Sequence, residues 1–510
     1  MTAVPQTPSA SEAAVRSAAD TTWTAEVVSA GRKYEAETAP VVNPARLGET
    51  VGTYALAGTR IVDEVVQNAL AAGAVWGSLT GVERGRLMHT AADVLERDMV
   101  SRAELLTREQ GKVLWESELD VGGAPRLLRY YADLAPAVDE EIVVRDERGT
   151  TVIRRRPMGP TVVIVPWNYP VYLCMMVLAP ALAAGNPVIV KPSEFAPLAL
   201  TKTLAMLAST LPDGVVNVVP GLGSEAGAAL VSHPGVRKVL FTGGTETGRE
   251  VLRGAAGNIT SVSLELGGND PAIVLDTAGL DDRLIREIRR SVYTCTGQVC
   301  FNIKRLYVQR GVYDEFVEKF RQAVDEIVVG DGLDPASTIG PLNNRRQFES
   351  VTALLQSTRK TGARVDVLGR RLDDTDWDNG YYLLPSVVTG IPHESALVSC
   401  EQFGPTVPVI PFDDIEDAVR MANDTEYGLA ASVWSEDAEH ALAVGRRIDA
   451  GSVFVNSHRV GSSDMTMPFG GMKRSGLGRN HGMWAIDECS ELQALSHRPD
   501  TSAFPGPAVH

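Results

Sequence analysis

Two hydrophobic patterns divide the chain. Apolar residues recur at helical spacing from Ile61 to Leu70 and again from Leu87 to Leu95, which predicts an N-terminal helical layer up to about residue 137. An amphipathic helix needs a second layer against which to bury its apolar face. We therefore expect these helices to cover a sheet formed by later residues.

From Thr161 onward, short apolar runs alternate with helical segments. The helical segments are 197–210 and 224–232, and the strand candidates are 161–166, 187–191, 215–219 and 236–241. This alternation predicts βαβ units and a mostly parallel sheet. A second series follows Pro271, with helices near 311–326 and 436–448 and strand candidates at 303–308, 407–411, 429–434 and 452–455. At 510 residues the chain is too long for one core, so we expect an α/β fold with two lobes.

Three segments lie outside the two lobes. Residues 142–156 and 489–495 are strand-like, and exposed strand edges of this kind often pair between subunits. They predict a small β arm for oligomerisation. Residues 1 to about 30 are rich in Ala, Ser and Thr, and charged residues interrupt any apolar stretch that could serve as a signal peptide. We expect that segment to be a flexible tail.

Composition narrows the classes of function. A formal net charge of −16 without a basic patch argues against binding to nucleic acid or to a membrane surface. No apolar run approaches the roughly 18 residues of a membrane span. The five cysteines are scattered and form no CxxC pair, which argues against a disulfide framework and against a zinc site. We expect a cytoplasmic protein without a bound metal.

Several short motifs could carry chemistry, and each has a plain structural alternative. Cys300 ends Gly-Gln-Val-Cys, but a free cysteine is more often a small buried hydrophobe. The glycines of 221–227 and 241–248 follow strands, where they could hold a dinucleotide or merely form turns. Lys191 and Glu194 could bind a ribose or form a surface pair, and Glu265 ends an apolar strand as either a solvated or a functional carboxylate.

Together these motifs resemble the ordered signatures of the aldehyde dehydrogenase superfamily. The resemblance covers roughly residues 40 to 495, and seven motifs carry it: VPWNYP (165–170), VKPSE (190–194), FTGGTETG (241–248), LELGGND (264–270), GQVC (297–300), EQFGP (401–405) and PFGGMKRSGLGR (468–479). It implies a Rossmann-like dinucleotide-binding domain, a second α/β catalytic domain and the β arm. The implied boundaries are 31–137 and 158–268 for the dinucleotide-binding domain, 269–466 for the catalytic domain, and 138–157 and 484–498 for the arm.

The resemblance also assigns three catalytic roles. Cys300 matches the nucleophile, whose thiolate attacks the aldehyde carbon. Asn168 matches the residue that stabilises the resulting oxyanion, together with the backbone N–H of Cys300. Glu265 matches the general base that activates water to hydrolyse the thioester, which argues against the CoA-acylating branch. A CoA-acylating enzyme and a catalytically silent family scaffold remain the alternatives.

For the cofactor, the resemblance implies NAD as hydride acceptor, with NADP left open. The residues expected to bind it are Val165, Trp167, Lys191, Ser193, Glu194, Gly223, Gly243, Gly244, Leu266, Glu401 and Phe403. Three positions depart from the family pattern. Gly244 replaces a common Ser, Cys400 replaces the first Glu of a pair, and Asn480 stands where some members have Glu. Loss of the Ser could loosen the contacts to the pyrophosphate or to the nicotinamide.

The expected substrate is a small-molecule aldehyde, bound in a mainly apolar tunnel. The residues implied to line the tunnel are Tyr169, Leu173, Met176, Phe301 and Met465. His458 and Arg459 could bind a substrate carboxylate, but a surface or hinge salt bridge is the plainer interpretation. An apolar aldehyde and a semialdehyde both stay open as substrates, and the expected assembly is a homodimer or homotetramer.

Overall fold

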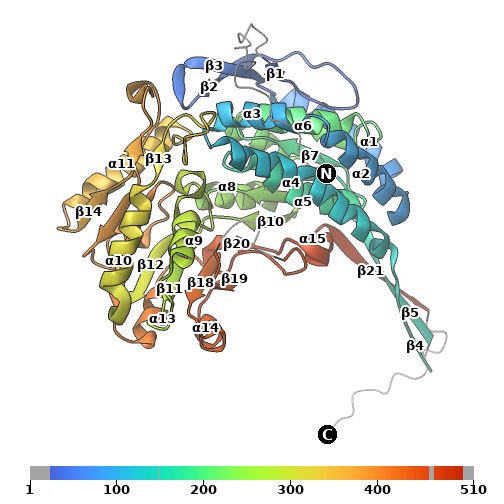
Figure 1. Cartoon of the computed structure of the whole chain (residues 1–510). Coiled ribbons are helices and arrows are strands. Elements are labelled where there is room, and N and C mark those ends of the chain that lie inside the picture. The colour runs from blue at the N-terminus through green and yellow to red at the C-terminus, as the bar shows by residue number, and fades with distance from the viewer. Residues whose placement is uncertain (1–22, 148, 459–463, 498–510) are drawn as a thin grey trace, which may run out of the picture.

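The computed structural model describes residues 23–147, 149–458 and 464–497 of the chain. Two α/β lobes lie side by side, and a narrow β ribbon projects from one of them (Figure 1). The predicted α/β class is therefore confirmed. Among the helices of these residues, none has both the length and the apolarity needed to cross a bilayer.

The first lobe is built on a six-stranded sheet. Its strand order is β20-β10-β9-β6-β7-β8, and all neighbours pair in parallel except β20 (Gly476–Leu477), which is antiparallel to β10. The parallel strands are β6 (Thr161–Ile164), β7 (Val188–Lys191), β8 (Val216–Val218), β9 (Lys238–Thr242) and β10 (Ser261–Glu265). Four of these were predicted from their apolar runs, with ends that agree to within three residues.

Helices cover both faces of this sheet, because successive strand residues point to opposite sides. Val163 and Val190 pack on one face and Val162 and Ile189 on the other. The first face is covered by α2 (Gly81–Leu95), α3 (Met99–Gln110), α4 (Leu114–Leu134), α5 (Pro170–Ala183) and α6 (Leu198–Ala208). The second face is covered by α1 (Thr59–Trp76), α7 (Ala228–Ser232) and α8 (Thr245–Ala256). The predicted N-terminal helical layer therefore packs as expected.

A three-stranded sheet near the N-terminus was not predicted. It contains β1 (Trp23–Ala25), β2 (Thr38–Asn43) and β3 (Arg46–Ala55), and Val28 pairs with Val218 at the edge of the large sheet. The expectation of a flexible tail is therefore wrong for residues 23–30, while residues 1–22 lie outside the described part of the chain. The β2–β3 turn also reaches the second lobe, where Tyr382 donates a hydrogen bond to the Ala45 carbonyl at 3.1 Å.

The second lobe contains a seven-stranded sheet of order β14-β16-β17-β12-β11-β18-β19. Its strands are β11 (Asp270–Val274), β12 (Ile303–Gln309), β14 (Arg364–Val367), β16 (Ser386–Thr389), β17 (Thr406–Phe412), β18 (Ala430–Trp434) and β19 (Ser452–Val455), and all pairs are parallel except β14 with β16. Its helices are α9 (Asp282–Tyr293), α10 (Arg310–Asp325), α11 (Arg345–Arg359), α12 (Ala396–Ser399), α13 (Ile415–Asn423) and α14 (Ala438–Gly445). A short pair, β13 (Val328–Val329) and β15 (Arg370–Arg371), lies apart from the sheet.

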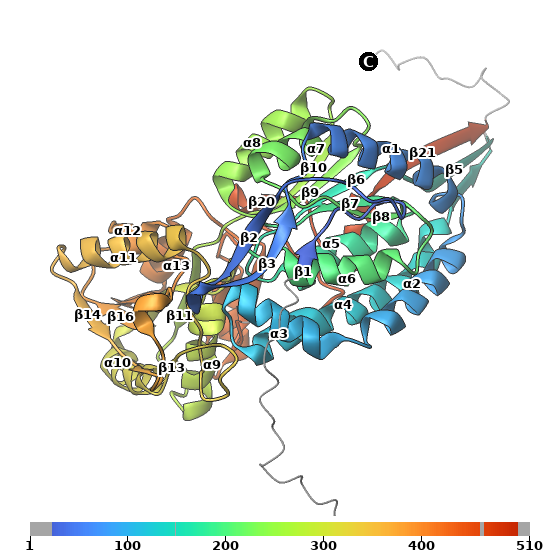
Figure 2. The same ribbon diagram turned by 90° about the horizontal axis from the view of Figure 1, so that it is seen from above.

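One connection fixes how the two large sheets face each other. Strand β10 ends at Glu265 and β11 begins at Asp270, so only four residues separate the two sheets. The carboxyl edge of the first sheet therefore meets the amino edge of the second. Figure 2 shows the two lobes meeting along this junction. In doubly wound folds the carboxyl edge is where ligands bind.

The projecting ribbon is the sheet β21-β5-β4, formed by β4 (Ile142–Asp146), β5 (Gly149–Pro157) and β21 (Ser490–His497), with α15 (Gly482–Glu488) leading into it. It joins the two predicted arm segments, which are more than 300 residues apart in sequence. Ile142 and Leu492 on this ribbon are 60% and 72% exposed, which is unusual for large apolar side chains gathered on one element.

Candidate active site

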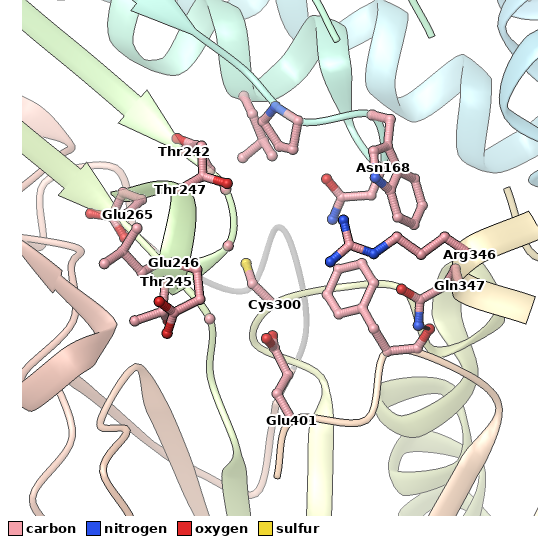
Figure 3. Close-up of a pocket in the computed structure, with 18 of the residues that line it drawn as sticks. Asn168, Thr242, Thr245, Glu246, Thr247, Glu265, Cys300, Arg346, Gln347 and Glu401 are labelled. Carbon is pink, nitrogen blue, oxygen red and sulfur yellow. Dashed lines mark hydrogen bonds between the residues drawn. The ribbon is translucent and has the colours of Figure 1, made fainter. Parts of the chain in front are cut away.

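A cavity of about 520 Å³ lies at the junction of the two sheets. The first sheet contributes the segments that follow β6, β9 and β10, and the second contributes the segments that precede β12 and β17. Its wall includes Trp167, Asn168, Leu173, Gly243, Gly244, Glu265, Leu266, Cys300, Glu401 and Phe403. Figure 3 shows Cys300 in the middle of this space, with Asn168 and Glu265 on different sides of it. The structure thus brings the three predicted catalytic residues to one cavity.

Cys300 follows a strained turn. Cys295, Thr296 and Gly297 have φ values of 52°, 56° and 76°, so three successive residues adopt the left-handed conformation. Glycine is required at the third, because a Cβ on Gly297 would lie 2.2 Å from the Gly404 carbonyl oxygen. Strain of this kind persists only where the surroundings fix the backbone. Here the buried carboxylate of Glu116 accepts a hydrogen bond from Cys295 N at 2.7 Å.

The electrostatic surroundings of Cys300 favour the neutral thiol. Burial raises the pKa of the Cys300 thiol well above its usual range, and nearby carboxylates, Glu401 first, raise it further. Lys304 acts in the opposite direction. Its buried Nζ donates a hydrogen bond to the Gly297 carbonyl at 2.7 Å, and burial lowers the pKa of this lysine to about 8. A positive charge or a proton acceptor in the cavity is therefore needed to generate the thiolate.

Asn168 is held by a buried ion pair. Lys112 donates hydrogen bonds to Asp120 at 2.6 Å and to the Asn168 carbonyl at 2.8 Å, and both ionic side chains are fully buried. The Asn168 amide in turn donates to the Gln298 carbonyl at 2.9 Å. An amide nitrogen carries two N–H groups, so one is left for a ligand beside Cys300. The sequence did not identify Lys112 or Asp120, because neither residue belongs to a recognised motif and no local pattern shows that the two side chains are buried.

Glu265 is the last residue of β10, and its side chain is 93% buried. One carboxylate oxygen accepts a hydrogen bond from Asn480 at 2.9 Å, whereas the other has no partner among the described residues. Burial raises the pKa of Glu265 to about 8, although Arg479 and the Asn480 hydrogen bond oppose the rise. A carboxyl group that titrates near neutral pH, with one free oxygen in a cavity, has the properties of a general base.

Glu401 and Phe403 form part of the floor of the cavity. Glu401 accepts a hydrogen bond from Gly268 N at 3.2 Å, and burial raises its pKa to about 7. Gly267 allows this approach, because a Cβ there would lie 2.4 Å from the Glu401 carboxylate. The Phe403 ring meets the Trp167 ring edge to face, with centroids 5.6 Å apart.

The other predicted cofactor residues lie along the same sheet edge, outside this cavity. Lys191 ends β7 and pairs with Glu194 at 3.0 Å, and Ser193 lies between them and accepts a hydrogen bond from Phe195 N. Gly223 follows β8 and opens a short helical turn. The Val165 side chain is buried in the core on one face of the sheet, so only the backbone of this residue can contact a ligand.

The cavity and this edge together fit an extended dinucleotide. Helix α8 begins directly at the cavity with Gly244 as its N-cap, and the first turn of a helix offers free backbone N–H groups to a phosphate. Glu265 and Asn168 both line this cavity, and each has a buried side-chain oxygen without a partner among the described residues. Within the described ranges, no cluster of three His, Cys, Asp or Glu side chains is arranged to hold a metal ion.

The predicted substrate residues fall into three places. Leu173 lines the cavity and shares a small apolar cluster with Tyr169 and Phe301 beside the cysteine loop. Met176 is buried in the core of the first lobe. Met465 is partly buried against that core, and its carbonyl accepts a hydrogen bond from the Tyr130 hydroxyl at 3.1 Å.

His458 is neither exposed nor part of a surface salt bridge. Its ring lies 2.8 Å from both the Ser432 hydroxyl and the Phe301 carbonyl. Trp434 donates to the same hydroxyl at 2.9 Å, so that hydroxyl can donate its own hydrogen to the histidine. This side chain therefore supports the residue that follows Cys300. Arg459 lies outside the described residues.

Comparison with known proteins places the chain in a family. The sequence profile of the aldehyde dehydrogenase family matches residues 32–495. A putative aldehyde dehydrogenase from Burkholderia cenocepacia is 34% identical, with a TM-score of 0.88 over 92% of this chain and 96% of that one. An NADP-dependent enzyme from E. coli is 32% identical, with a TM-score of 0.88 over 92% and 98%.

A third similar structure contains a cofactor. Betaine aldehyde dehydrogenase from Staphylococcus aureus in complex with NAD+ is 30% identical, with a TM-score of 0.88 over 92% of this chain and 94% of that one. The resemblance of the motifs is thus confirmed at the level of the whole chain. The chain belongs to the aldehyde dehydrogenase family and is an NAD(P)-dependent aldehyde dehydrogenase.

Proposed function

We propose that this enzyme oxidises an aldehyde to the carboxylic acid by a hydrolytic route through a thioester on Cys300. The observation that carries the proposal is the placement of Cys300, Asn168 and Glu265 around one cavity at the junction of the sheets. We infer NAD as the preferred acceptor, because Glu194 beside Lys191 presents a carboxylate that suits ribose hydroxyls and repels a 2′-phosphate.

In the first step the Cys300 thiolate attacks the aldehyde carbon, and the carbonyl oxygen becomes an oxyanion. The free N–H of Asn168 and the backbone N–H of Cys300 stabilise that oxyanion. When bound, the nicotinamide ring supplies the hydride acceptor and a positive charge near the cysteine. Loss of the hydride from the former aldehyde carbon leaves a thioester on Cys300.

In the second step Glu265 removes a proton from water, and the hydroxide attacks the thioester carbon. The carbon–sulfur bond breaks, the carboxylic acid forms, and Cys300 returns to the thiolate. Glu265 suits this step because it lines the cavity, one of its oxygens has no partner among the described residues, and its pKa of about 8 lets it take up a proton near neutral pH.

The substrate side is proposed from the apolar cluster near Cys300. Tyr169, Leu173 and Phe301 gather beside the nucleophile, which suits an aldehyde with an apolar chain. A semialdehyde is the alternative substrate, and this cluster gives its carboxylate no charged partner. Met176, which lies on α5 in the core of the first lobe, and Met465, which is partly buried against that core, are proposed to form the deeper wall of the substrate tunnel.

The test follows NADH formation at 340 nm with short, aromatic, long-chain and semialdehyde substrates. Cys300→Ala is the control for the nucleophile, and undiminished turnover in that variant overturns the mechanism. Glu265→Gln is expected to give a single burst of NADH and then stall with an acyl group on Cys300, which intact-protein mass spectrometry detects. Acyl transfer to added CoA in the parent enzyme indicates the acylating reaction instead.

We also propose a cytoplasmic homodimer or homotetramer. The β21-β5-β4 ribbon carries Ile142 and Leu492 exposed and presents a strand edge for a second copy. Free thiols, including the exposed Cys400, are typical of a reducing compartment. Size-exclusion chromatography with light scattering measures the assembly, and a monomer at micromolar concentration contradicts it.

A further inference from the structure

The cavity has an unusual balance of charge. Three carboxylates line it, from Glu246, Glu265 and Glu401, and the guanidinium of Arg346 is the cationic side chain in its wall. A dinucleotide carries two negative charges on its diphosphate. A cavity that takes such a ligand must offset them, and this inference rests on the proposed function in assuming that a dinucleotide binds there.

One wall of the cavity is the start of α8, which lines it with Gly243 and Gly244 and with the side chains of Thr245, Glu246 and Thr247. Gly244 is the N-cap of α8 and makes no side-chain cap, so the first turn presents bare N–H groups. The position does not require glycine. Its φ is an ordinary −72°, and a Cβ built there meets nothing within 4 Å. The hydroxyl that a serine would supply is therefore absent although there is room for it.

The opposite wall supplies a cation. Arg346 lies in the first turn of α11, and Figure 3 shows its guanidinium extending into the cavity toward the side where Cys300 and Asn168 lie. No described residue forms a hydrogen bond or ion pair with it. The turn that carries it is anchored, because Asn344 caps the helix and Gln347 donates to the Phe403 carbonyl at 2.9 Å.

We propose that Arg346 binds the cofactor diphosphate from the side opposite α8 and replaces the hydroxyl that Gly244 lacks. A guanidinium can form two parallel hydrogen bonds to phosphate oxygens, which a backbone N–H cannot. Arg346 is thus a binding residue for the diphosphate, and it does not discriminate NAD from NADP. The Lys191–Glu194 pair, at the end of β7, is the part of the site that would face a 2′-phosphate. Strand β7 lies two strands, or about 10 Å, from β9, which leads into α8.

The adjacent arginine provides a matched control. Arg345 lies on the same helical turn, is exposed, is 3.8 Å from Glu349, and does not line the cavity. Arg345→Gln and Arg346→Gln therefore remove the same charge from the same turn, and only the second removes it from the cavity. Because Arg346 is exposed, its replacement leaves the core intact.

The test is calorimetric titration of the full-length enzyme with ADP-ribose, NAD+, NADP+ and AMP. Arg346→Gln is expected to weaken ADP-ribose and NAD+ by about tenfold, which is the loss of one charge-assisted contact. NADP+ is expected to weaken by the same factor and AMP by less, since AMP has only one phosphate. Arg345→Gln is expected to bind all four ligands like the parent, and Arg346→Lys to fall between the two.

Three results overturn the inference. One is equal ADP-ribose affinity in the two glutamine variants. Another is a loss confined to NADP+, which would place Arg346 at the 2′-phosphate. The third is unchanged cofactor binding with a raised KM for carboxylated aldehydes only, which would assign it to the substrate. If the parent enzyme itself fails to bind ADP-ribose, the proposed dinucleotide site is wrong instead.

A second variant tests directly whether Arg346 replaces the hydroxyl that Gly244 lacks. Gly244→Ser introduces a hydroxyl at the α8 N-cap, where the structure has open space. In the Arg346→Gln background it is expected to restore several-fold of the lost ADP-ribose affinity. The absence of any recovery, with an otherwise folded protein, contradicts the idea that the two groups serve one phosphate.

Discussion

Glu265 should destabilise the folded enzyme above mildly acidic pH, and its replacement by glutamine should reveal this. The carboxyl is buried, and its pKa rises from 4.5 to about 8 on folding. The folded state therefore keeps the proton that the unfolded state releases. The free energy of unfolding therefore falls as the pH rises above 4.5, and it stops falling once the pH exceeds about 8, where Glu265 is ionised in both states. Glutamine cannot ionise, and its carbonyl can still accept the Asn480 hydrogen bond.

The size of the effect follows from that rise in pKa. Each tenfold change in the acidity constant corresponds to about 1.4 kcal/mol, so the full penalty is about 5 kcal/mol at pH 9 and about 3 kcal/mol at pH 7. At pH 5 the two proteins should be nearly equally stable. An unfolding entropy of about 2 cal/mol/K per residue gives about 1 kcal/mol per degree for 510 residues. Glu265→Gln should therefore raise Tm by about 3 °C at pH 7 and about 5 °C at pH 9.

The assay is differential scanning fluorimetry of both proteins between pH 5 and pH 9. Glu246→Gln is the control, because its carboxylate also lines the cavity but is 83% exposed and pairs with Arg249. It should change Tm little at any pH. A Tm difference between Glu265→Gln and the parent that stays constant from pH 5 to pH 9 would refute the argument that burial governs this carboxyl.

Four further results are expected. Because Glu265 must be ionised to act as a base, the steady-state rate should rise with pH up to about 8 and then level off, and a flat profile from pH 6 to 9 contradicts this role. Asn168→Ala should lower kcat by about two to three powers of ten with a small change in Tm, measured by NADH formation. Lys112→Met leaves the buried Asp120 charge unpaired and should destabilise the protein by about 3–5 kcal/mol in urea unfolding, more than Lys112→Met combined with Asp120→Asn. Gly297→Ala should lower the free energy of unfolding by at least about 1 kcal/mol, and it should also lower kcat because the added Cβ displaces the cysteine loop. A parent-like kcat would show that the loop tolerates a Cβ.

Much of the fold could be read from local pattern. The buried parallel strands β6, β7 and β9 are short apolar runs between helical segments, and their order along the chain predicts their class. The N-terminal sheet escaped prediction for a local reason. Strands β2 and β3 contain Gly, Pro and polar residues and are half exposed, so their apolar alternation is weak. Their pairing depends on partners far away in the sequence.

The site was predictable only where chemistry leaves a motif. Cys300, Glu265 and Asn168 stand in the motifs by which the sequence resembles the aldehyde dehydrogenase superfamily, and the structure collects them at one cavity. Arg346 carried no signal, because it is one charged residue among several at the start of an exposed helix. Only its position across the cavity from Gly244 separates it from Arg345.

The sequence by itself determined the α/β class and the family and supplied the residues proposed to react, because these depend on periodicity and on residue types in local motifs. Tertiary structure alone decided the environments. Burial at the sheet junction raises the pKa of Glu265 to about 8, and a buried Lys112–Asp120 pair fixes the Asn168 carbonyl. Both effects require groups far apart in the chain to exclude water together, and desolvation is a property of the packed molecule rather than of any segment.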